Sequence, residues 1–241
     1  MKATLKYPVF YLAPAEHLVY VFWREENVTT RRLLAVGLPI SMQMVLEVSA
    51  FALTLIMMGW IGTVPLAAHQ VVLSLSNIVY MVVVGISAAT TIMVSHRYGA
   101  GDYRGMRRAA LASWHLGIVA NLLTMACFVA FRRFLPELFT SDRAVIGVAA
   151  QLFLMAALYQ IPDGLQTIAL GVLRGMQDVR ITMYYAFVSY IVINLPVGYF
   201  CAFILGWGAP GLWVGFIVGL CIAAFLLIRR YRRLYRRLTL D

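Results

Sequence analysis

Residues 145–173 read VIGVAAQLFLMAALYQIPDGLQTIALGVL, and this stretch decides the class of protein to which the chain belongs. A helix needs about 20 consecutive apolar residues to cross the hydrocarbon core of a bilayer. The stretch exceeds that length and contains a single charged side chain, Asp163. Five further apolar stretches follow the same rule, at Leu33–Met58, Ala67–Val94, Ala109–Phe131, Ile181–Leu205 and Gly211–Ile228. The sequence therefore predicts an all-α membrane protein, a bundle of six transmembrane helices.

The composition excludes a water-soluble domain. Apolar residues make up 62% of the 241 residues and charged residues 12%, against roughly 45–50% and about 25% in soluble domains. Too little polar surface remains to cover a soluble globule. The formal net charge of +10 does not indicate nucleic-acid binding, because membrane topology accounts for the placement of the basic residues. The three cysteines lie in separate apolar stretches and indicate neither a disulfide framework nor a metal site.

The basic residues gather on one side of the predicted membrane. If each apolar stretch crosses the bilayer, alternate loops lie on opposite sides. Arg132, Arg133 and Arg143 then lie on one side, and all the others of the 20 Lys and Arg residues lie on the opposite side. Cytoplasmic loops carry an excess of Lys and Arg, so we expect both termini in the cytoplasm.

The apolar stretches also define the expected organisation of the chain. Residues 1–30 read as a cytoplasmic or membrane-surface segment with the character of a linker, because the short apolar run there contains Pro8 and is a poor signal peptide. Residues 31–230 form the transmembrane lobe, and residues 231–241 form a basic cytoplasmic tail.

Two acidic residues, Glu47 and Asp163, lie deep within the predicted spans. At 1.5 Å per residue they are roughly 21 Å and 17 Å from the cytoplasmic ends of their helices, near the midplane where transporter sites lie. A charge at that depth costs about 2.5–3.5 kcal/mol on insertion scales. Each acid is therefore expected to bind an ion or carry a proton; the alternative is a protonated carboxyl that bonds to a neighbouring helix.

Both acids belong to polar stripes at helical spacing. Residues three or four positions apart share one face of a helix. Gln43 lies one turn before Glu47. The residues at these spacings around Asp163 are Tyr159, Gln160, Gln166 and Thr167. We expect both stripes to face the interior of the bundle, because a lipid-facing polar stripe would be costly.

The motifs of soluble and membrane enzymes are missing from the sequence. It contains no HExxH pair for zinc, no GxSxG nucleophile elbow and no GxxxxGK[ST] phosphate loop. These observations argue against an enzyme, and no metal site is expected beyond a possible Na⁺ at Glu47 and Asp163.

Several short motifs, taken in order, give the chain a resemblance to a known family. They are Gly37-Leu38-Pro39-Ile40 before Glu47, residues 66–71 (LAAHQV), residues 99–102 (GAGD), residues 159–163 (YQIPD) with Gln166, and residues 173–175 (LRG) with Asp178. Over about residues 31–232 the sequence resembles the C-terminal six-helix half of the MATE (multidrug and toxic compound extrusion) antiporters. It departs from that pattern at Val83, Met93 and Ser95, where relatives often carry proline, arginine and glycine.

The resemblance implies an antiporter of the bacterial inner membrane that exports organic cations or drugs in exchange for Na⁺ or H⁺, with no cofactor besides that ion. In the NorM-like branch, the residues matching Glu47, Asp163 and Tyr159 form the cation site. The expected partners are membrane lipid, a small organic cation as substrate, and a second six-helix lobe, either another copy or a separate chain. One alternative is a lipid-linked saccharide flippase of the same superfamily, disfavoured because no Lys or Arg lies deep in any span. The other alternative is a non-transporting structural or assembly subunit.

The charge asymmetry makes a prediction about orientation. A reporter enzyme that is active only outside the cytoplasm should stay inactive when fused after Asp241, because the basic side of the chain remains inside. Measured reporter activity in intact cells checks this. A strong signal would contradict the topology and, with it, the matching depths of the two acids.

Overall fold

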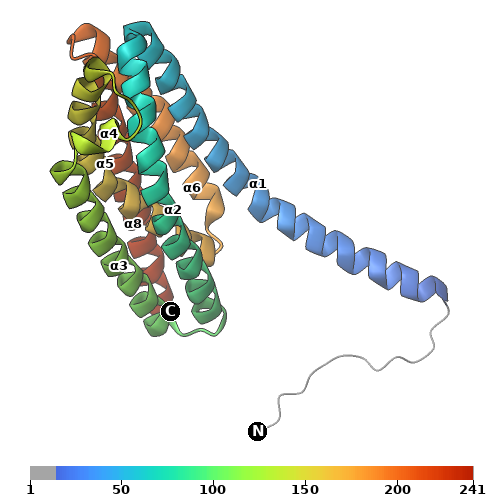
Figure 1. Cartoon of the computed structure of the whole chain (residues 1–241). Coiled ribbons are helices and arrows are strands. Elements are labelled where there is room, and N and C mark those ends of the chain that lie inside the picture. Colours follow the sequence, from blue (N-terminus) through green and yellow to red (C-terminus); the bar gives the residue numbers. More distant parts are fainter. Residues whose placement is uncertain (1–14, 241) are drawn as a thin grey trace. The chain divides into compact units, whose positions relative to one another are not determined.

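The computed structural model of the chain describes residues 15–240, and these fold almost entirely into helices (Figure 1). The elements in chain order are α1 (Ala15–Ile61), α2 (Thr63–Gly99), α3 (Tyr103–Ala130), α4 (Phe134–Glu137), α5 (Arg143–Gly175), α6 (Val179–Ala186), η1 (Phe187–Asn194), α7 (Leu195–Tyr199), η2 (Phe200–Ile204) and α8 (Ala209–Leu240). The all-α architecture predicted from the sequence is confirmed.

Six helical stretches within the described residues are long and apolar enough to cross a membrane. They are Leu33–Ile61, Thr63–Gly99, Tyr103–Ala130, Arg143–Gly175, Val179–Ile204 and Ala209–Thr239. All six predicted spans are confirmed. The last one differs most in its bounds, because the arginines after Ile228 continue the helix instead of ending it, and arginine is a good helix former.

The chain divides into two compact units, residues 1–38 and residues 39–241. Within the first unit, residues 15–38 are the first part of α1. The linker-like segment expected at residues 1–30 lies partly outside the described residues. Within the second unit, the residues expected to form a separate tail from position 231 are helical as far as Leu240 and belong to α8.

The fifth span departs from a regular α-helix. It runs through α6, the π-helical segment η1, the short helix α7 and a second π-helical segment, η2. Pro196 lies at the start of α7 and has no N–H to donate back along η1. π turns inside α-helices are rare and often occur at functional sites, and η1 supplies Tyr190 to the site described below.

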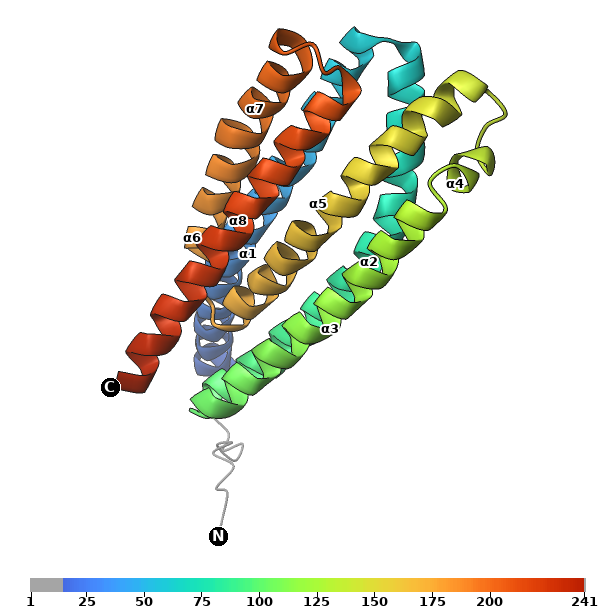
Figure 2. The same cartoon turned by 90° about the vertical axis from the view of Figure 1, so that its left-hand side faces the viewer.

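Helix α5 is the centre of the residue 39–241 unit. It contacts α2, α8 and α3, and Figure 2 shows it between α3 and α8. From Ala156 to Leu173 most of its side chains are buried, the polar Gln160, Asp163 and Gln166 among them. A membrane helix that is polar on buried faces must satisfy those groups within the protein, because lipid offers no hydrogen bonds.

Glycines let α2 approach α5 closely. A Cβ atom added to Gly171 would lie 2.6 Å from the backbone oxygen of Ser87, and one added to Gly175 would lie 2.9 Å from that of Thr91. Two hydroxyls use this proximity: Ser87 donates to the carbonyl of Thr167 at 2.7 Å, and Thr91 donates to that of Gly171 at 3.0 Å. Small residues and interhelical hydrogen bonds are the usual basis of helix association in membranes.

A second glycine face joins α8 to the fifth span. A Cβ atom on Gly215 would lie 2.6 Å from the carbonyl oxygen of Asn194, and one on Gly211 would lie 2.6 Å from the backbone nitrogen of Ala202. Gly219 continues the face one turn later, with Ser189 as its neighbour. The GxxxGxxxG repeat of α8 is therefore a packing surface.

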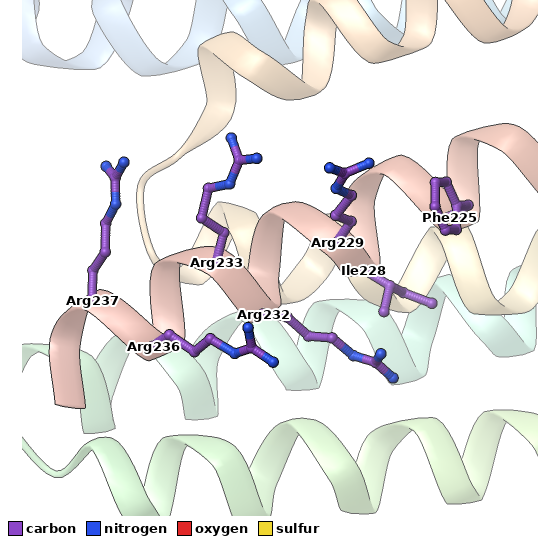
Figure 3. Close-up of a pocket in the computed structure, with 7 residues that line it drawn as sticks. All are labelled: Phe225, Ile228, Arg229, Arg232, Arg233, Arg236 and Arg237. Atoms are coloured by element: carbon purple, nitrogen blue, oxygen red, sulfur yellow. The ribbon is translucent and has the colours of Figure 1, made fainter. Parts of the chain in front are cut away.

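The last turns of α8 carry a row of arginines. Arg229, Arg232, Arg233, Arg236 and Arg237 are exposed and project from the helix beyond Phe225 and Ile228 (Figure 3). Arg230 is half-buried and points instead toward the loop between α5 and α6.

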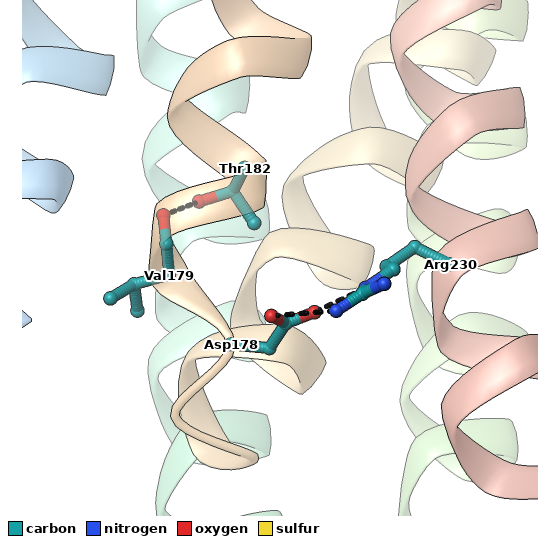
Figure 4. Close-up of polar contacts among 4 residues, drawn as sticks. All are labelled: Asp178, Val179, Thr182 and Arg230. Atoms are coloured by element: carbon teal, nitrogen blue, oxygen red, sulfur yellow. Dashed lines mark hydrogen bonds and ion pairs between the residues drawn. The ribbon is translucent and has the colours of Figure 1, made fainter. Parts of the chain in front are cut away.

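Arg230 clamps that loop through a bidentate ion pair with Asp178. Its Nε atom lies 2.7 Å from Oδ2, and its Nη2 atom lies 3.2 Å from Oδ1 (Figure 4). The turn before Asp178 contains Gln177 in the left-handed region, with φ of 61°. Thr182 completes the start of α6 by donating its hydroxyl to the carbonyl of Val179 at 2.7 Å.

Gly101 and Asp102 shape the short connection between α2 and α3. Gly101 has a φ of 71°, which glycine adopts without strain. The carboxylate of Asp102 caps α3 by accepting from the backbone N–H of Gly105 at 2.8 Å, and it pairs with Arg97 at 2.8 Å. These contacts favour the ionised form and lower the pKa of Asp102, the N–H of Gly105 contributing most.

The close contact between α2 and α5 gives a stability prediction. Gly171→Ala should reduce the free energy of unfolding by about 1–3 kcal/mol, because the added methyl overpacks the interface. Gly147→Ala is the matched control in the same helix: no atom lies within 4 Å of its added Cβ, so it should be neutral or stabilising by up to about 1 kcal/mol. Unfolding in mild detergent, followed by circular dichroism, measures both. Equal losses in the two variants would contradict the close approach.

Candidate functional site

The two acids of the spans lie on helices α1 and α5. Asp163 is buried, with 6% of its surface exposed, and Glu47 is half-buried. Thr167, from the stripe around Asp163, lines the same pocket as Gln43 and Glu47. The two polar stripes predicted from the sequence therefore meet in one region of the residue 39–241 unit.

Asp163 is held by an amide from its own helix. The Nε2 atom of Gln166 lies 3.4 Å from Oδ1 of Asp163, a long hydrogen bond, and 2.6 Å from the hydroxyl oxygen of Tyr190 on η1. Tyr159, one turn earlier on α5, is also buried beside the aspartate. Its ring packs edge-on against Trp213 of α8, with centroids 5.7 Å apart. Aromatic packing on one side thus fixes the phenol whose other side borders the acid.

Glu47 is bordered by Gln43 from its own helix and by tyrosines from two other elements. Gln43 donates from Nε2 to the Oε2 atom of Glu47 over 3.3 Å. The hydroxyls of Tyr80 on α2 and Tyr190 on η1 lie close to the same carboxylate. Tyr190 therefore lies near Glu47 and also contacts Gln166, the residue that holds Asp163, so it connects the two acids.

Arg174 reaches into this network from the end of α5. Its Nη2 atom donates to Oε1 of Gln43 at 2.8 Å, while the amide nitrogen of Gln43 faces Glu47. Gln43 is almost fully buried and uses both ends of its amide. No Lys or Arg lies deep in a span of the sequence, yet the long side chain of Arg174 carries its charge inward from the helix end.

A pocket of about 90 Å³ opens beside Glu47. Its lining comes from α1, α2 and α5 and comprises Gln43, Met44, Glu47, Tyr80, Val84, Ser87, Ala88, Thr91, Thr167, Leu170 and Arg174. The Oγ1 atom of Thr167 and the Nε atom of Arg174 are buried and have no hydrogen-bond partner among the residues that the structure describes. Buried polar groups are nearly always hydrogen-bonded, and the volume suits a few water molecules or a hydrated ion.

The residues predicted around Asp163 do not all point the same way. Gln160 accepts a hydrogen bond through Oε1 from Thr124 of α3 at 3.2 Å, so it lies in the interface between α3 and α5. Asn121 of α3 lies against Gly164 in the same interface. Thr167 lines the pocket, and Gln166 and Tyr159 adjoin Asp163. The stripe therefore divides between two faces of α5.

Three residues of the network were not singled out from the sequence: Tyr80, Arg174 and Tyr190. Tyr190 carries a recognisable signal, because Asn194 follows it at helical spacing inside an apolar stretch. Arg174 belongs to the motif of residues 173–175, but its position at the end of an apolar stretch gives no sign that it faces the acids. Tyr80 has no neighbouring charge in the sequence that marks it.

The chemistry of this site is that of oxygen ligands around a hard cation or a proton. Carboxylates, tyrosine hydroxyls and amide oxygens are suitable ligands for such ions. Within residues 15–240 no group of three or more His, Cys, Asp or Glu side chains is placed to hold a metal ion. Two carboxylates beside tyrosine hydroxyls and amide oxygens have the chemistry to exchange a proton or to bind a single cation.

Comparison with known proteins places the chain among membrane transporters. A family model described as MatE matches residues 39–200. The probable multidrug resistance protein NorM of Xanthomonas campestris pv. campestris is 38% identical over 207 residues, which cover 86% of this chain and 45% of that protein. The multidrug resistance protein MdtK of Pectobacterium atrosepticum is 38% identical over 223 residues, covering 89% and 48%.

Solved structures agree on the fold. The crystal structure of the Vibrio cholerae MATE transporter VcmN in the bent form superposes with a TM-score of 0.81 at 17% identity, over 89% of this chain and 48% of that one. The chain spans about half the length of the relatives and structures that it matches.

The contact through Gln43 predicts energetic coupling between Arg174 and Glu47. In a double-mutant cycle, Arg174→Gln and Glu47→Gln should be non-additive by about 0.5–3 kcal/mol, because each change leaves the other charge without its partner. Thermal unfolding in detergent measures the four variants. Arg180 is exposed, so a parallel cycle with Arg180→Gln should be additive. Additivity in both cycles would show that Arg174 does not act on Glu47.

Proposed function

The chain belongs to the MatE family, and from this premise we propose that it is one six-helix lobe of a cation-coupled antiporter that exports organic cations. The observation that carries the proposal is the meeting of Glu47 and Asp163 inside the spans, with Gln43, Tyr159 and Tyr190 around them. We propose that Na⁺ or H⁺ binds at this site. Intramembrane acids are kept at such cost mainly where they serve ion binding or transport.

We assign the lobe to the C-terminal half of the family's architecture. The support is the order of the motifs, from Gly37-Leu38-Pro39-Ile40 before Glu47 to residues 159–163 and 173–175. The bacterial relatives support placement in the inner membrane. The arginine distribution supports cytoplasmic termini.

The charges of the site suit a monovalent cation. When both carboxyls are ionised, Arg174 neutralises one of the two negative charges, and one more positive charge completes the balance. A proton on either acid, or one Na⁺ among the oxygen atoms, supplies it. The ion then favours the conformation in which the two acids are close, and this differential affinity is what couples ion binding to a conformational change.

The substrate requires more space than this pocket offers. About 90 Å³ is far below the roughly 300–1,000 Å³ of a cavity that holds a drug-sized molecule. We propose that the organic cation binds in a larger cavity formed with a second six-helix lobe, another copy of this chain or a separate one. The matched relatives, which are about twice as long, support a second lobe.

A flippase for anionic, lipid-linked saccharides is the alternative that Arg174 favours, since a buried guanidinium binds phosphate well. Two observations oppose it. The guanidinium is already engaged by Gln43, and two acids lie nearby, so the region is negative overall. A negative cavity attracts a cation and repels a pyrophosphate.

Asp163→Asn tests the coupling role. The amide keeps the shape of the side chain but removes the charge, so cation-driven efflux of a dye should be abolished in everted vesicles when the second lobe is present. Asp142→Asn is the matched control at the other end of α5: Asp142 caps the helix through the N–H of Ala144 at 2.8 Å, and asparagine caps equally well. Efflux by the control should be normal. Gradient-dependent efflux that survives in Asp163→Asn would show that the aspartate is structural.

A further inference from the structure

We propose that the groove between α3 and α8 binds an anionic phospholipid through its phosphate. The groove has a volume of about 610 Å³ and lies over α5 at the end of α8 that carries the arginine row. This inference does not depend on the proposed transport function.

The rim of the groove is basic. Arg107 of α3 and Arg232 and Arg236 of α8 line it and are exposed. Figure 3 shows Arg232 and Arg236 projecting from one side of α8. The described lining of the groove contains no acidic side chain, so the positive charge of the arginines is available to an anion. Arg107 is fixed in place by Tyr235, with its guanidinium carbon 5.7 Å from the ring centroid.

Two of the side chains that line the groove carry donors without a partner. The hydroxyl of Tyr231 and the Nε1 atom of Trp114 are buried and have no hydrogen-bond partner among the described residues. Only 5% of the surface of Tyr231 is exposed. The two rings hold one another edge to face at 5.3 Å. Buried donors of this kind are normally satisfied, and phosphate oxygens would accept from both while the arginines balance the charge.

Apart from His115, which is exposed, the remaining lining is apolar, and this apolar surface is why we assign the ligand as a lipid. Leu111, Ile118, Leu165 and Ile228 continue the groove along the spans, away from the arginines. An acyl chain can lie on this surface while the phosphate stays among the basic groups. Anionic lipids give the cytoplasmic leaflet its negative charge, and clusters of basic residues near the membrane surface bind them.

The groove is separate from the candidate cation site. The pocket beside Glu47 is lined by α1, α2 and α5, whereas the groove is lined by α3, α5 and α8. Variants in the groove therefore leave the acids and their hydrogen bonds in place.

Binding of a fluorescent phosphatidylglycerol to the purified chain in uncharged detergent tests the proposal. Unlabelled phosphatidylglycerol should displace the probe, whereas phosphatidylcholine and water-soluble glycerol phosphate should not. Displacement by phosphatidylcholine would show an unselective apolar surface. Displacement by glycerol phosphate would show a phosphate site that does not require acyl chains. Either result would overturn the assignment to an anionic lipid.

Two sets of variants locate the site. Replacing Arg107, Arg232 and Arg236 by Gln should weaken binding about a hundredfold, from roughly 1 kcal/mol per basic residue. The matched control replaces three neighbours on α8, Arg229, Arg233 and Arg237, by Gln and removes the same charge. It should weaken binding much less. Equal losses would indicate diffuse attraction of lipid to a basic surface and would refute a defined groove.

Tyr231→Phe gives a test that leaves the charge unchanged. The ring remains, and only the unpartnered hydroxyl is lost, so folding should be preserved. A hydrogen bond to a charged group is worth about 1.5–3 kcal/mol, so the affinity for phosphatidylglycerol should fall about tenfold or more. An unchanged affinity would show that the hydroxyl does not contact the phosphate and that the proposed site is wrong.

Discussion

The close approach of α2 to α5 is the constraint on which the rest of the residue 39–241 unit depends. Gly171 and Gly175 leave no room for a side chain, and hydroxyls of α2 donate to carbonyls of α5 across the contact. Because lipid cannot replace a lost hydrogen bond, the two backbones are held at a fixed distance. That distance brings Tyr80 of α2 to the same pocket as Thr167 of α5. The candidate site therefore depends on glycine packing as much as on its acids.

The sequence was sufficient to predict the six spans and to place Glu47 and Asp163 within two of them, because hydrophobic length and the position of a charge in an apolar stretch are local properties. It was not sufficient for their partners. Tyr190 reaches Gln166 from a π-helical segment, whose register a regular helical period does not predict. Gln160 shares a spacing with Asp163 yet lies toward α3, since the position of the neighbouring helix decides which face is which.

The arginines illustrate the same limit. In the sequence, the arginines near the helix ends predict only how the chain is oriented in the membrane. In the structure they have three different environments: Arg174 turns inward to Gln43, Arg230 clamps Asp178, and the row after Ile228 stays exposed. The three environments differ in the direction that the long side chain takes. That direction depends on where its apolar stem is buried and on which hydrogen-bond acceptor is nearest. Neither quantity can be read from a composition or a charge count.

The clamp between Arg230 and Asp178 has a mechanical consequence. Only Gly175, Met176 and Gln177 separate Asp178 from Arg174, and the turn that they form is tight, with backbone hydrogen bonds returning to α5. The basic end of α8 is thus connected to Arg174, the arginine beside Glu47, through the ion pair and this tight turn. The position of the basic end of α8 and the position of Arg174 are therefore linked by one ion pair and one short turn.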